Sequence, residues 1–267
     1  MAPDFLIIGV QRSGTTSLYN YLIRHPKILG ALVKEVHFFD LFFHKGINWY
    51  LGNFPWLPQN YGNQGAITGE ASPYYIFHPL VPTRVAATFP SVKIILLLRN
   101  PINRAYSHYQ NEVRLGFEHL SFEQAIDQEA ARLDGETQKI IQDERYQSVN
   151  HRHFSYLSRG VYIDQIKNWL EVFPREQILI AKSEDFFESP QILLGKVLSW
   201  LNLPEWDYPK FRVHNRLEYQ KINPITQDRL HAYFEPYNNA LYDFLGVNFG
   251  WNAPSGYKDR STASSLV

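Results

Sequence analysis

A short apolar run near the N-terminus, followed by a glycine-containing turn and a helical pattern, constrains the fold more than any other feature of the sequence. The run covers residues 5–10 and the turn covers residues 11–16. The helical pattern then continues to about His25, where Pro26 ends it. A strand, a glycine turn and a helix in this order are typical of the opening of an α/β nucleotide-binding fold.

Further apolar runs fit the same architecture. Residues 92–98 form a nearly continuous apolar run, which indicates a parallel strand covered on both faces. Weaker strand patterns occur at residues 66–70 and 177–181. Helical patterns occur at residues 101–114, 160–173, 189–201 and 226–245. Because strands alternate with helices, we expect an α/β fold of the P-loop type, with three layers in which helices flank a central parallel sheet.

We expect one domain over residues 1–255, followed by a flexible C-terminal tail at residues 256–267. A charged, helix-prone stretch predicts a helical insertion at about residues 115–155. Residues 34–62 are aromatic and punctuated by glycine and proline, which predicts loops with short helices. A chain of 267 residues buries about three-quarters of its unfolded surface, so it needs no disulfide or metal to hold the fold together.

Composition and charge exclude several classes of function. The 26 Lys and Arg balance the 26 Asp and Glu, so we expect no nucleic-acid partner. The chain has no cysteine, and its histidines lack the spacings that place two ligands on one helix face, so we expect no metal site. No apolar run approaches about 18 residues, and no signal-peptide pattern is present. We therefore expect a cytoplasmic chain, or a domain of a longer protein, without a membrane span.

Residues 9–16 read Gly-Val-Gln-Arg-Ser-Gly-Thr-Thr and have the glycine spacing of a phosphate-binding loop. Backbone N–H groups and the positive end of the following helix favour an anion there. A triphosphate enzyme carries lysine where this chain has Thr15, whereas the hydroxyl that follows is kept as Thr16. The cation is instead Arg12, which favours a nucleotide whose reactive group is attached at the 5′-phosphate, without a bridging metal. The alternative is an ordinary tight turn.

Arg99 directly follows the apolar run at residues 92–98, which predicts a second anion site. Ligands bind at the carboxyl ends of strands in open α/β sheets. Arg104 and Ser107 lie on the predicted next helix, on the side of the cleft that Arg99 shares. A guanidinium group and a hydroxyl suit a phosphate. The alternative is that both arginines pair with surface carboxylates.

These segments resemble the PAPS-dependent sulfotransferase family, where PAPS is 3′-phosphoadenosine 5′-phosphosulfate. Residues 9–16 resemble its 5′-phosphosulfate loop, and residues 98–109 resemble its 3′-phosphate signature. Segments that resemble the heparan sulfate sulfotransferase branch are residues 34–40, 46–51, 70–75, 158–162, 173–177 and 249–251. The resemblance implies a bacterial-type soluble member of transferase class EC 2.8.2. Such an enzyme moves a sulfuryl group in line from PAPS to an acceptor hydroxyl or amine and releases adenosine 3′,5′-bisphosphate (PAP).

The resemblance also implies roles for individual residues. Those around the 5′-phosphate are Ser13, Gly14, Thr15, Thr16 and Ser17. Arg12 takes the place of a catalytic lysine, and it keeps the charge but cannot donate a proton. The remaining donor residues are Arg99 and Ser107 at the 3′-phosphate, with Arg159 and Gly160 at the adenine.

The resemblance makes Glu35 the catalytic base, and His37 is the second candidate. On an extended segment, two side chains that are two residues apart share a face, so one orients the other. The alternative for His37 is a buried structural histidine among Phe38 and Phe39. The alternative for Glu35 is a surface carboxylate paired with Lys34.

We expect Glu70, Ser72 and Tyr74 to position or contact the acceptor, which is a small molecule or a carbohydrate. Ala71 stands where the glucosaminyl 3-O-sulfotransferases carry a second lysine, so heparan sulfate itself is a weaker choice. Acceptor identity, O- against N-sulfation and oligomeric state stay open.

Two other functions remain open. A P-loop kinase-like phosphotransferase would require Mg²⁺ and the lysine that is absent at Thr15. A non-catalytic nucleotide-binding member would lack the base or the cation at the leaving group, whereas Glu35 and Arg12 are both present.

Overall fold

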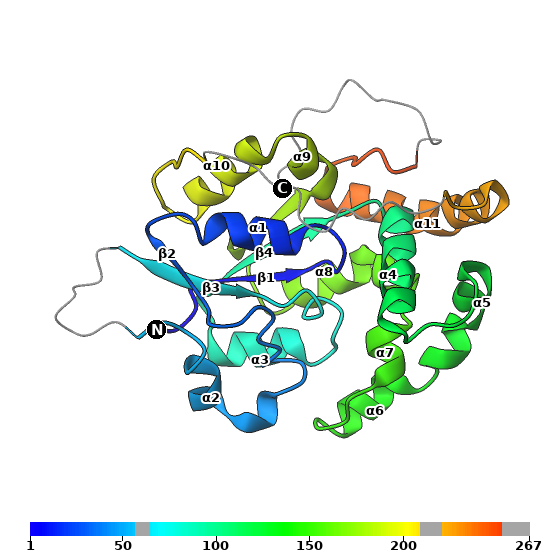
Figure 1. Ribbon diagram of the computed structural model, residues 1–267, viewed down its shortest axis with the longest axis horizontal. Helices are drawn as coiled ribbons and strands as arrows, with labels where there is room; N and C mark the ends of the chain where they lie inside the picture. The colour runs from blue at the N-terminus through cyan, green and yellow to red at the C-terminus, as the bar shows by residue number, and fades with distance from the viewer. Residues whose placement is uncertain (57–64, 209–220, 253–267) are drawn as a thin grey trace. The chain divides into compact units, whose positions relative to one another are not determined.

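The computed structural model describes residues 1–56, 65–208 and 221–252 (Figure 1). The chain divides into two compact units. The first unit comprises residues 1–98 and 170–216, and the second comprises residues 99–169 and 217–265. The single domain expected over residues 1–255 stays a prediction, and the expected tail at residues 256–267 lies outside the described residues.

The first unit contains a five-stranded parallel sheet in the order β2-β3-β1-β4-β5. The strands are β1 (Phe5–Gly9), β2 (Ile28–Gly30), β3 (Ile67–Ala71), β4 (Lys93–Leu98) and β5 (Ile178–Lys182). All five residues of β1 and the last five of β4 are buried, because helices cover both faces of the sheet. The predicted α/β fold with a central parallel sheet is confirmed.

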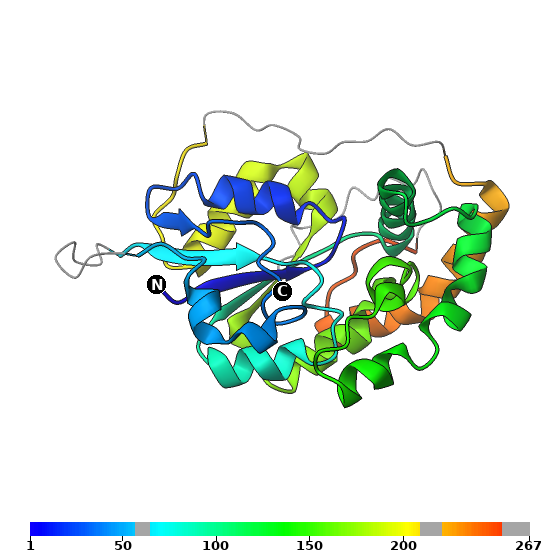
Figure 2. The same cartoon turned by 60° about the horizontal axis from the view of Figure 1, so that its bottom comes forward.

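The helices of the first unit form the outer layers. They are α1 (Thr15–Leu22), α2 (Ile47–Leu51), α3 (Val81–Thr88), α9 (Ser183–Glu188) and α10 (Pro190–Trp200). In both views, α1 and α10 lie over one face of the sheet and α3 lies over the other (Figures 1 and 2). Leu18 of α1 and Leu194 of α10 are fully buried in a core cluster with Ile95 of β4. Burial of each such side chain contributes about 1.5–3 kcal/mol to stability.

The second unit contains helices and no strand among its described residues. Its helices are α4 (Pro101–Leu115), α5 (Phe122–Leu133), α6 (Glu136–Gln142), α7 (Val149–His153), α8 (Tyr162–Leu170) and α11 (Pro224–Leu245). Asn100 caps α4 by accepting hydrogen bonds from the N–H groups of Ile102 and Asn103. The helix predicted at residues 101–114 is confirmed by α4, and residues 115–155 contain α5, α6 and α7, whereas their status as an insertion stays a prediction. No helix in the described parts of the chain is long and apolar enough to cross a bilayer.

Three elements of the first unit were not expected from the sequence. β2 is only three residues long, and it exists because it pairs with β3, from Ile28 opposite Ile67 to Gly30 opposite Gly69. The pattern of residues 81–88 is too short to distinguish α3 from a loop. α9 was also missed, although it follows β5 directly.

Candidate active site

The loop between β1 and α1 is tightly curled. The Oγ atom of Ser13 donates to the carbonyl oxygen of Val10 at 2.6 Å, and the Val10 N–H donates to the Leu97 carbonyl oxygen at 3.0 Å. Arg12 and Gly14 both adopt left-handed backbone conformations, with φ angles of 72° and 95°. Glycine is the residue that adopts this conformation without strain. The curl therefore places Gly14 at the N-cap of α1.

The N-terminus of α1 has the features of an anion site. Gly14 offers no side-chain cap, and the first turn of α1 contains no acidic residue. The N–H groups of Thr15, Thr16 and Ser17 lie at the positive end of the helix dipole, which favours a bound anion. The side chains of Thr15 and Ser17 are buried, whereas Thr16 and Arg12 are partly exposed. The residues present therefore fit a phosphate or sulfate group.

The end of β3 lies beside this loop. The Ser72 N–H donates to the Ile7 carbonyl oxygen at 3.1 Å, which ties the end of β3 to β1. The two neighbouring strands thus bring Ser13–Ser17 and Glu70–Ser72 to the same edge of the sheet. This is the edge at which α/β sheets bind ligands.

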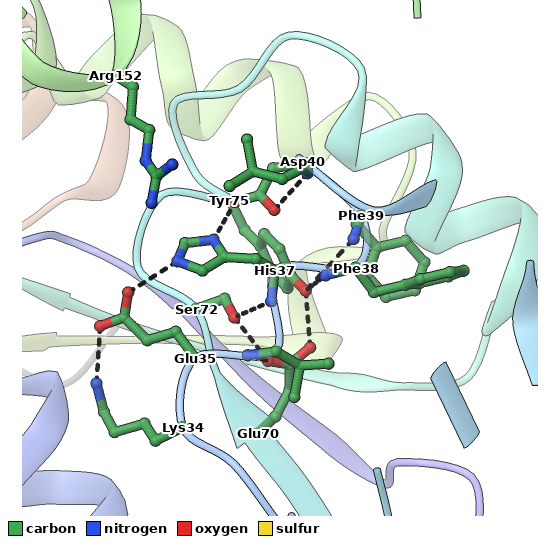
Figure 3. A network of polar contacts seen from close by, with 12 residues as sticks. Lys34, Glu35, His37, Phe38, Phe39, Asp40, Glu70, Ser72, Tyr75 and Arg152 are labelled. Carbon is green, nitrogen blue, oxygen red and sulfur yellow. Dashed lines mark hydrogen bonds and ion pairs between the residues drawn. The ribbon is translucent and has the colours of Figure 1, made fainter. Parts of the chain in front are cut away.

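A network of charged side chains surrounds Glu35 (Figure 3). One oxygen, Oε1, contacts Lys34 Nζ at 2.8 Å, and the other, Oε2, contacts His37 Nε2 at 3.1 Å. His37 Nδ1 contacts Asp40 Oδ2 at 2.7 Å. The imidazole therefore bridges two carboxylates, of which Asp40 is fully buried and Glu35 is 34% exposed. The alternative interpretation of each residue is met in part. Glu35 pairs with Lys34, as a surface carboxylate would, and the His37 ring is mostly buried, as in a structural histidine.

The network fixes the charges of its members. Burial by itself lowers the pKa of His37, but hydrogen bonds to Asp40 and Glu35 outweigh it and raise the pKa to about 9. Burial by itself raises the pKa of Glu35, but the hydrogen bond from His37 and the charge of Lys34 outweigh it and lower the pKa to about 2. At neutral pH, His37 is therefore an imidazolium and Glu35 is an ionised carboxylate.

The backbone at His37 differs from the geometry that the sequence predicts. The prediction is an extended segment, but His37 has a φ angle of 54°, in the left-handed region. Its N–H donates to Ser72 Oγ at 3.2 Å, which holds the turn. The side chains of Glu35 and His37 nevertheless meet, because the turn directs the imidazole back toward the carboxylate (Figure 3).

Glu70 is a buried centre of hydrogen bonds at the end of β3. Its donors are Ser72 Oγ at 2.7 Å, Tyr75 Oη at 2.8 Å, Tyr50 Oη at 2.9 Å and the Val36 N–H at 3.3 Å. Burial raises the pKa of Glu70, and the hydrogen bonds from Ser72, Tyr75 and Tyr50 offset this only in part. This carboxylate therefore ties the segment around Glu35 to the sheet.

Ser72 and Tyr74 are also buried. The exposed fraction is 0% for Ser72 and 5% for Tyr74. Ser72 Oγ accepts from the His37 N–H and donates to Glu70, and the Tyr74 ring lies edge-on to His78 with ring centroids 5.6 Å apart. Direct contact of Glu70, Ser72 or Tyr74 with an acceptor stays a prediction.

The other predicted donor residues belong to the second unit. Arg99 directly follows β4, and its carbonyl oxygen accepts from Tyr162 Oη at 2.7 Å. Ser107 is buried on α4. Arg104 is fully buried, and its Nη2 atom donates to the Tyr156 carbonyl oxygen. Its burial excludes the surface pair considered for Arg104, whereas the phosphate contact considered for it stays a prediction.

Arg159 and Gly160 are packed within the same unit. The guanidinium group of Arg159 donates to Ser155 Oγ at 2.7 Å and to the carbonyl oxygens of His151 and Arg152 at 3.0 and 2.6 Å. A Cβ atom at Gly160 would lie 2.7 Å from the Phe234 ring. The adenine contact expected of both residues stays a prediction.

Sequence reasoning missed Asp40, Tyr50 and Tyr75 as parts of this site. Asp40 stands three residues after His37, and the spacing Glu-x-His-x-x-Asp was a signal available for it. Tyr50 and Tyr75 reach Glu70 from separate segments, and no local pattern identifies them. In the described parts of the chain, no group of three or more His, Asp or Glu side chains is arranged to hold a metal ion.

Comparisons with known proteins identify the family to which this chain belongs. The sulfotransferase domain family matches residues 2–233. The membrane-associated sulfotransferase kil1 of Dictyostelium discoideum is 29% identical over 93% of this chain and 66% of its own length. The bifunctional heparan sulfate N-deacetylase/N-sulfotransferase 1 of Caenorhabditis elegans is 29% identical over 92% of this chain, which spans only 30% of that protein.

A solved structure agrees with the sequence comparisons. The crystal structure of a sulfotransferase from Alicyclobacillus acidocaldarius has a TM-score of 0.75 to this chain and is 27% identical. The similarity covers 95% of this chain and 100% of that one. The resemblance inferred from the sequence motifs is thus confirmed, and the chain belongs to the sulfotransferase domain family.

Proposed function

We propose that this protein transfers the sulfuryl group of PAPS to a hydroxyl or amine of a small-molecule or carbohydrate acceptor and releases PAP. The observation that carries the proposal is the Glu35 side chain, held by Lys34 and His37 at the same sheet edge as the candidate anion-binding loop. A base and an anion site together are what sulfuryl transfer requires. Family membership supports the donor, and the heparan sulfate in the name of one relative supports a carbohydrate acceptor.

The loop residues Ser13–Ser17 would hold the 5′-phosphosulfate. The uncapped N–H groups at the start of α1 point at this position, and the first turn of α1 has no acidic residue that would repel the donor. Arg12 would stabilise the negative charge that develops on the leaving phosphate, and stabilisation of this kind lowers the barrier of many group-transfer reactions more than any other effect. Arg99 and Ser107 would bind the 3′-phosphate through a guanidinium fork and a hydroxyl.

Glu35 would accept the proton of the acceptor hydroxyl. His37 carries a proton at neutral pH and has both ring nitrogens engaged, so it is unsuited to act as the base. Its role would be to hold one oxygen of Glu35 and leave the other near Lys34. Asp40 would in turn orient His37. A carboxylate with a pKa of about 2 is a weak base, so we expect the acceptor to displace Lys34 and thereby raise the basicity of Glu35.

Glu70 and Ser72 would position the segment that carries Glu35 and His37. Glu70 accepts from the Val36 N–H, and Ser72 accepts from the His37 N–H, so together they fix two successive backbone positions of this segment. We propose positioning as their first role.

The first test is calorimetric titration of PAP without magnesium into the wild type and Arg99→Ala. We expect micromolar or tighter binding, weakened about tenfold or more in the variant, which corresponds to roughly 1.4 kcal/mol. Arg229→Ala is the matched control, because Arg229 pairs with Asp127 on the surface of the same unit. Absence of PAP binding to the wild type, with binding of ATP and Mg²⁺ instead, would favour the phosphotransferase alternative.

The second test is transfer from ³⁵S-labelled PAPS to a panel of alcohols, phenols, amines and desulfated oligosaccharides. Label in any acceptor product supports an active enzyme and identifies the acceptor class. Normal PAP binding with no turnover on the whole panel favours the non-catalytic alternative.

A further inference from the structure

Helix α9 carries two adjacent phenylalanines with opposite surroundings. Phe186 is 2% exposed and belongs to the hydrophobic core. Phe187 is 50% exposed, so half of a large aromatic ring is left in water. α9 follows β5 directly, so Phe187 lies on the connection that leaves the carboxyl edge of the sheet.

The Phe187 ring lies against the phosphate loop. A Cβ atom built on Gly14 would be 2.8 Å from Cε1 and 3.1 Å from Cζ of this ring. Gly14 therefore lacks a side chain for two reasons, since its φ angle is 95° and the ring occupies the space. The contact places an exposed aromatic surface directly beside the proposed anion site.

A hydrogen bond fixes this arrangement. The Ser183 hydroxyl, at the start of α9, donates to the carbonyl oxygen of Ser13 in the loop. Because Phe186 is anchored in the core and Ser183 is anchored to the loop, the helix that carries Phe187 is held at two points. The two anchors therefore hold the helix backbone so that the half-exposed Phe187 ring lies beside the loop.

The adenine of PAPS needs a binding partner, and an aromatic side chain is a suitable one. Arg159 uses its guanidinium group on carbonyl oxygens and Ser155 within the second unit, and Gly160 packs against Phe234. Every nucleobase has a π-face, and stacking on an aromatic side chain is a common way to hold it. A ring beside the 5′-phosphate site is suitably placed for the nucleoside attached to that phosphate.

We propose that Phe187 is a donor-binding residue that stacks on or packs against the adenine of PAPS and PAP. This inference rests on the proposed function, because it requires the loop at Ser13–Ser17 to bind the 5′-phosphate. It assigns the base recognition to α9, in the same unit as that loop.

The test is calorimetric titration of two ligands into the wild type, Phe187→Ala and Phe187→Tyr. One ligand is PAP, and the other is an abasic deoxyribose 3′,5′-bisphosphate, which keeps both phosphates and lacks the base. We expect Phe187→Ala to weaken PAP binding about tenfold, within the range known for base stacking, and Phe187→Tyr to restore it. The affinity for the abasic ligand should change less than about twofold in both variants. Phe244→Ala is the matched control, because Phe244 is 45% exposed on α11.

The outcomes separate this inference from the function on which it rests. Equal weakening of PAP and of the abasic ligand would show that Phe187 acts only through the shape of the loop, and would overturn the proposal. Unchanged PAP affinity in Phe187→Ala would overturn it as well, while the proposed function would stand. Absence of PAP binding to the wild type would overturn both.

Discussion

Glu35 and Glu70 are two glutamates of one site with opposite properties. Glu35 is 34% exposed and contacts two cationic groups, Lys34 and His37. Glu70 is 1% exposed and accepts hydrogen bonds from neutral hydroxyl and amide groups. The pKa of Glu35 is lowered to about 2, whereas the pKa of Glu70 is raised above its ordinary value.

The difference indicates that hydrogen bonds from charged partners lower the pKa of a carboxyl group in this site more than hydrogen bonds from neutral partners do. Burial disfavours the ionised form of both residues, and hydrogen bonds from His37 and Lys34 together with their positive charges overcome it for Glu35. A carboxylate held by cations and open to solvent suits proton transfer. A carboxylate held by neutral donors in the interior suits support of the backbone.

Glu35→Gln tests the proposed role of Glu35 as the general base and should have the largest effect. Removal of a general base lowers kcat by about 10²–10⁴-fold, or roughly 3–5 kcal/mol in the barrier. PAP affinity should stay unchanged, because the substitution does not touch the phosphate loop. Steady-state kinetics with the best acceptor of the panel measure the loss, and the exposed Glu171→Gln serves as the control. A kcat within about threefold of the wild type would refute the assignment.

Glu70→Ala tests the supporting side. The substitution leaves the hydroxyls of Tyr50, Tyr75 and Ser72 without their acceptor in the interior, which should cost roughly 3 kcal/mol of unfolding free energy. Urea denaturation measures this value. Glu205→Ala, at an exposed position, should change it by less than about 0.5 kcal/mol. Equal stability of the two variants would contradict the supporting role.

His37→Gln tests how the positive charge of His37 acts on Glu35. The variant loses this charge and keeps a polar side chain. We expect kcat at neutral pH to fall about tenfold through lost positioning. In the wild type, kcat should decline as pH rises through about 9, where His37 loses its proton, and this decline should be absent in the variant. The pH–rate profile measures both effects, with the exposed His119→Gln as control. A decline near pH 9 in both proteins would assign it to another group.

The raised pKa of His37 also predicts how the stability difference between the wild type and His37→Gln depends on pH. The folded-state pKa of about 9 lies above the ordinary value of 6.5, so the charged ring stabilises the folded state fully below pH 6.5. This stabilisation is lost as pH rises through about 9. The difference in unfolding free energy between the wild type and His37→Gln should therefore shrink between about pH 6 and pH 10 in urea denaturation. A difference that stays constant over this range would contradict a charged His37.

Lys34→Met should have the smallest effect. Lys34 and Glu35 are both partly exposed, and pairs of this kind contribute about 0–1 kcal/mol to stability. Because one cation near Glu35 is lost, its pKa should rise toward the ordinary value. Carbon NMR titration of the Glu35 carboxyl measures this shift. Lys139→Met, which removes the exposed partner of the buried Glu136, should leave the Glu35 titration unchanged. An unshifted Glu35 pKa in Lys34→Met would show that His37 alone holds the charge.

Much of the fold was predictable because its signals are local. The apolar runs of β1 and β4 identified the buried strands, and Asn100-Pro101 marked the start of α4. β2 was not predictable, because three residues carry no pattern of their own and become a strand only beside β3. The left-handed turn at His37 was missed for a related reason, since the hydrogen bond to Ser72 that holds it joins residues 35 positions apart.

The sequence by itself was enough to predict a phosphate-binding loop at residues 9–16 and Glu35 as the base, because both predictions depend on the order of neighbouring residues. Tertiary structure decided the charges of Glu35 and His37, the burial of Glu70 and Arg159, and the contact of Phe187 with the loop. These properties arise from partners that are distant along the chain, as in the 170-residue separation between Ser183 and Ser13. Burial and the charge of such partners set a pKa, and no local pattern encodes them.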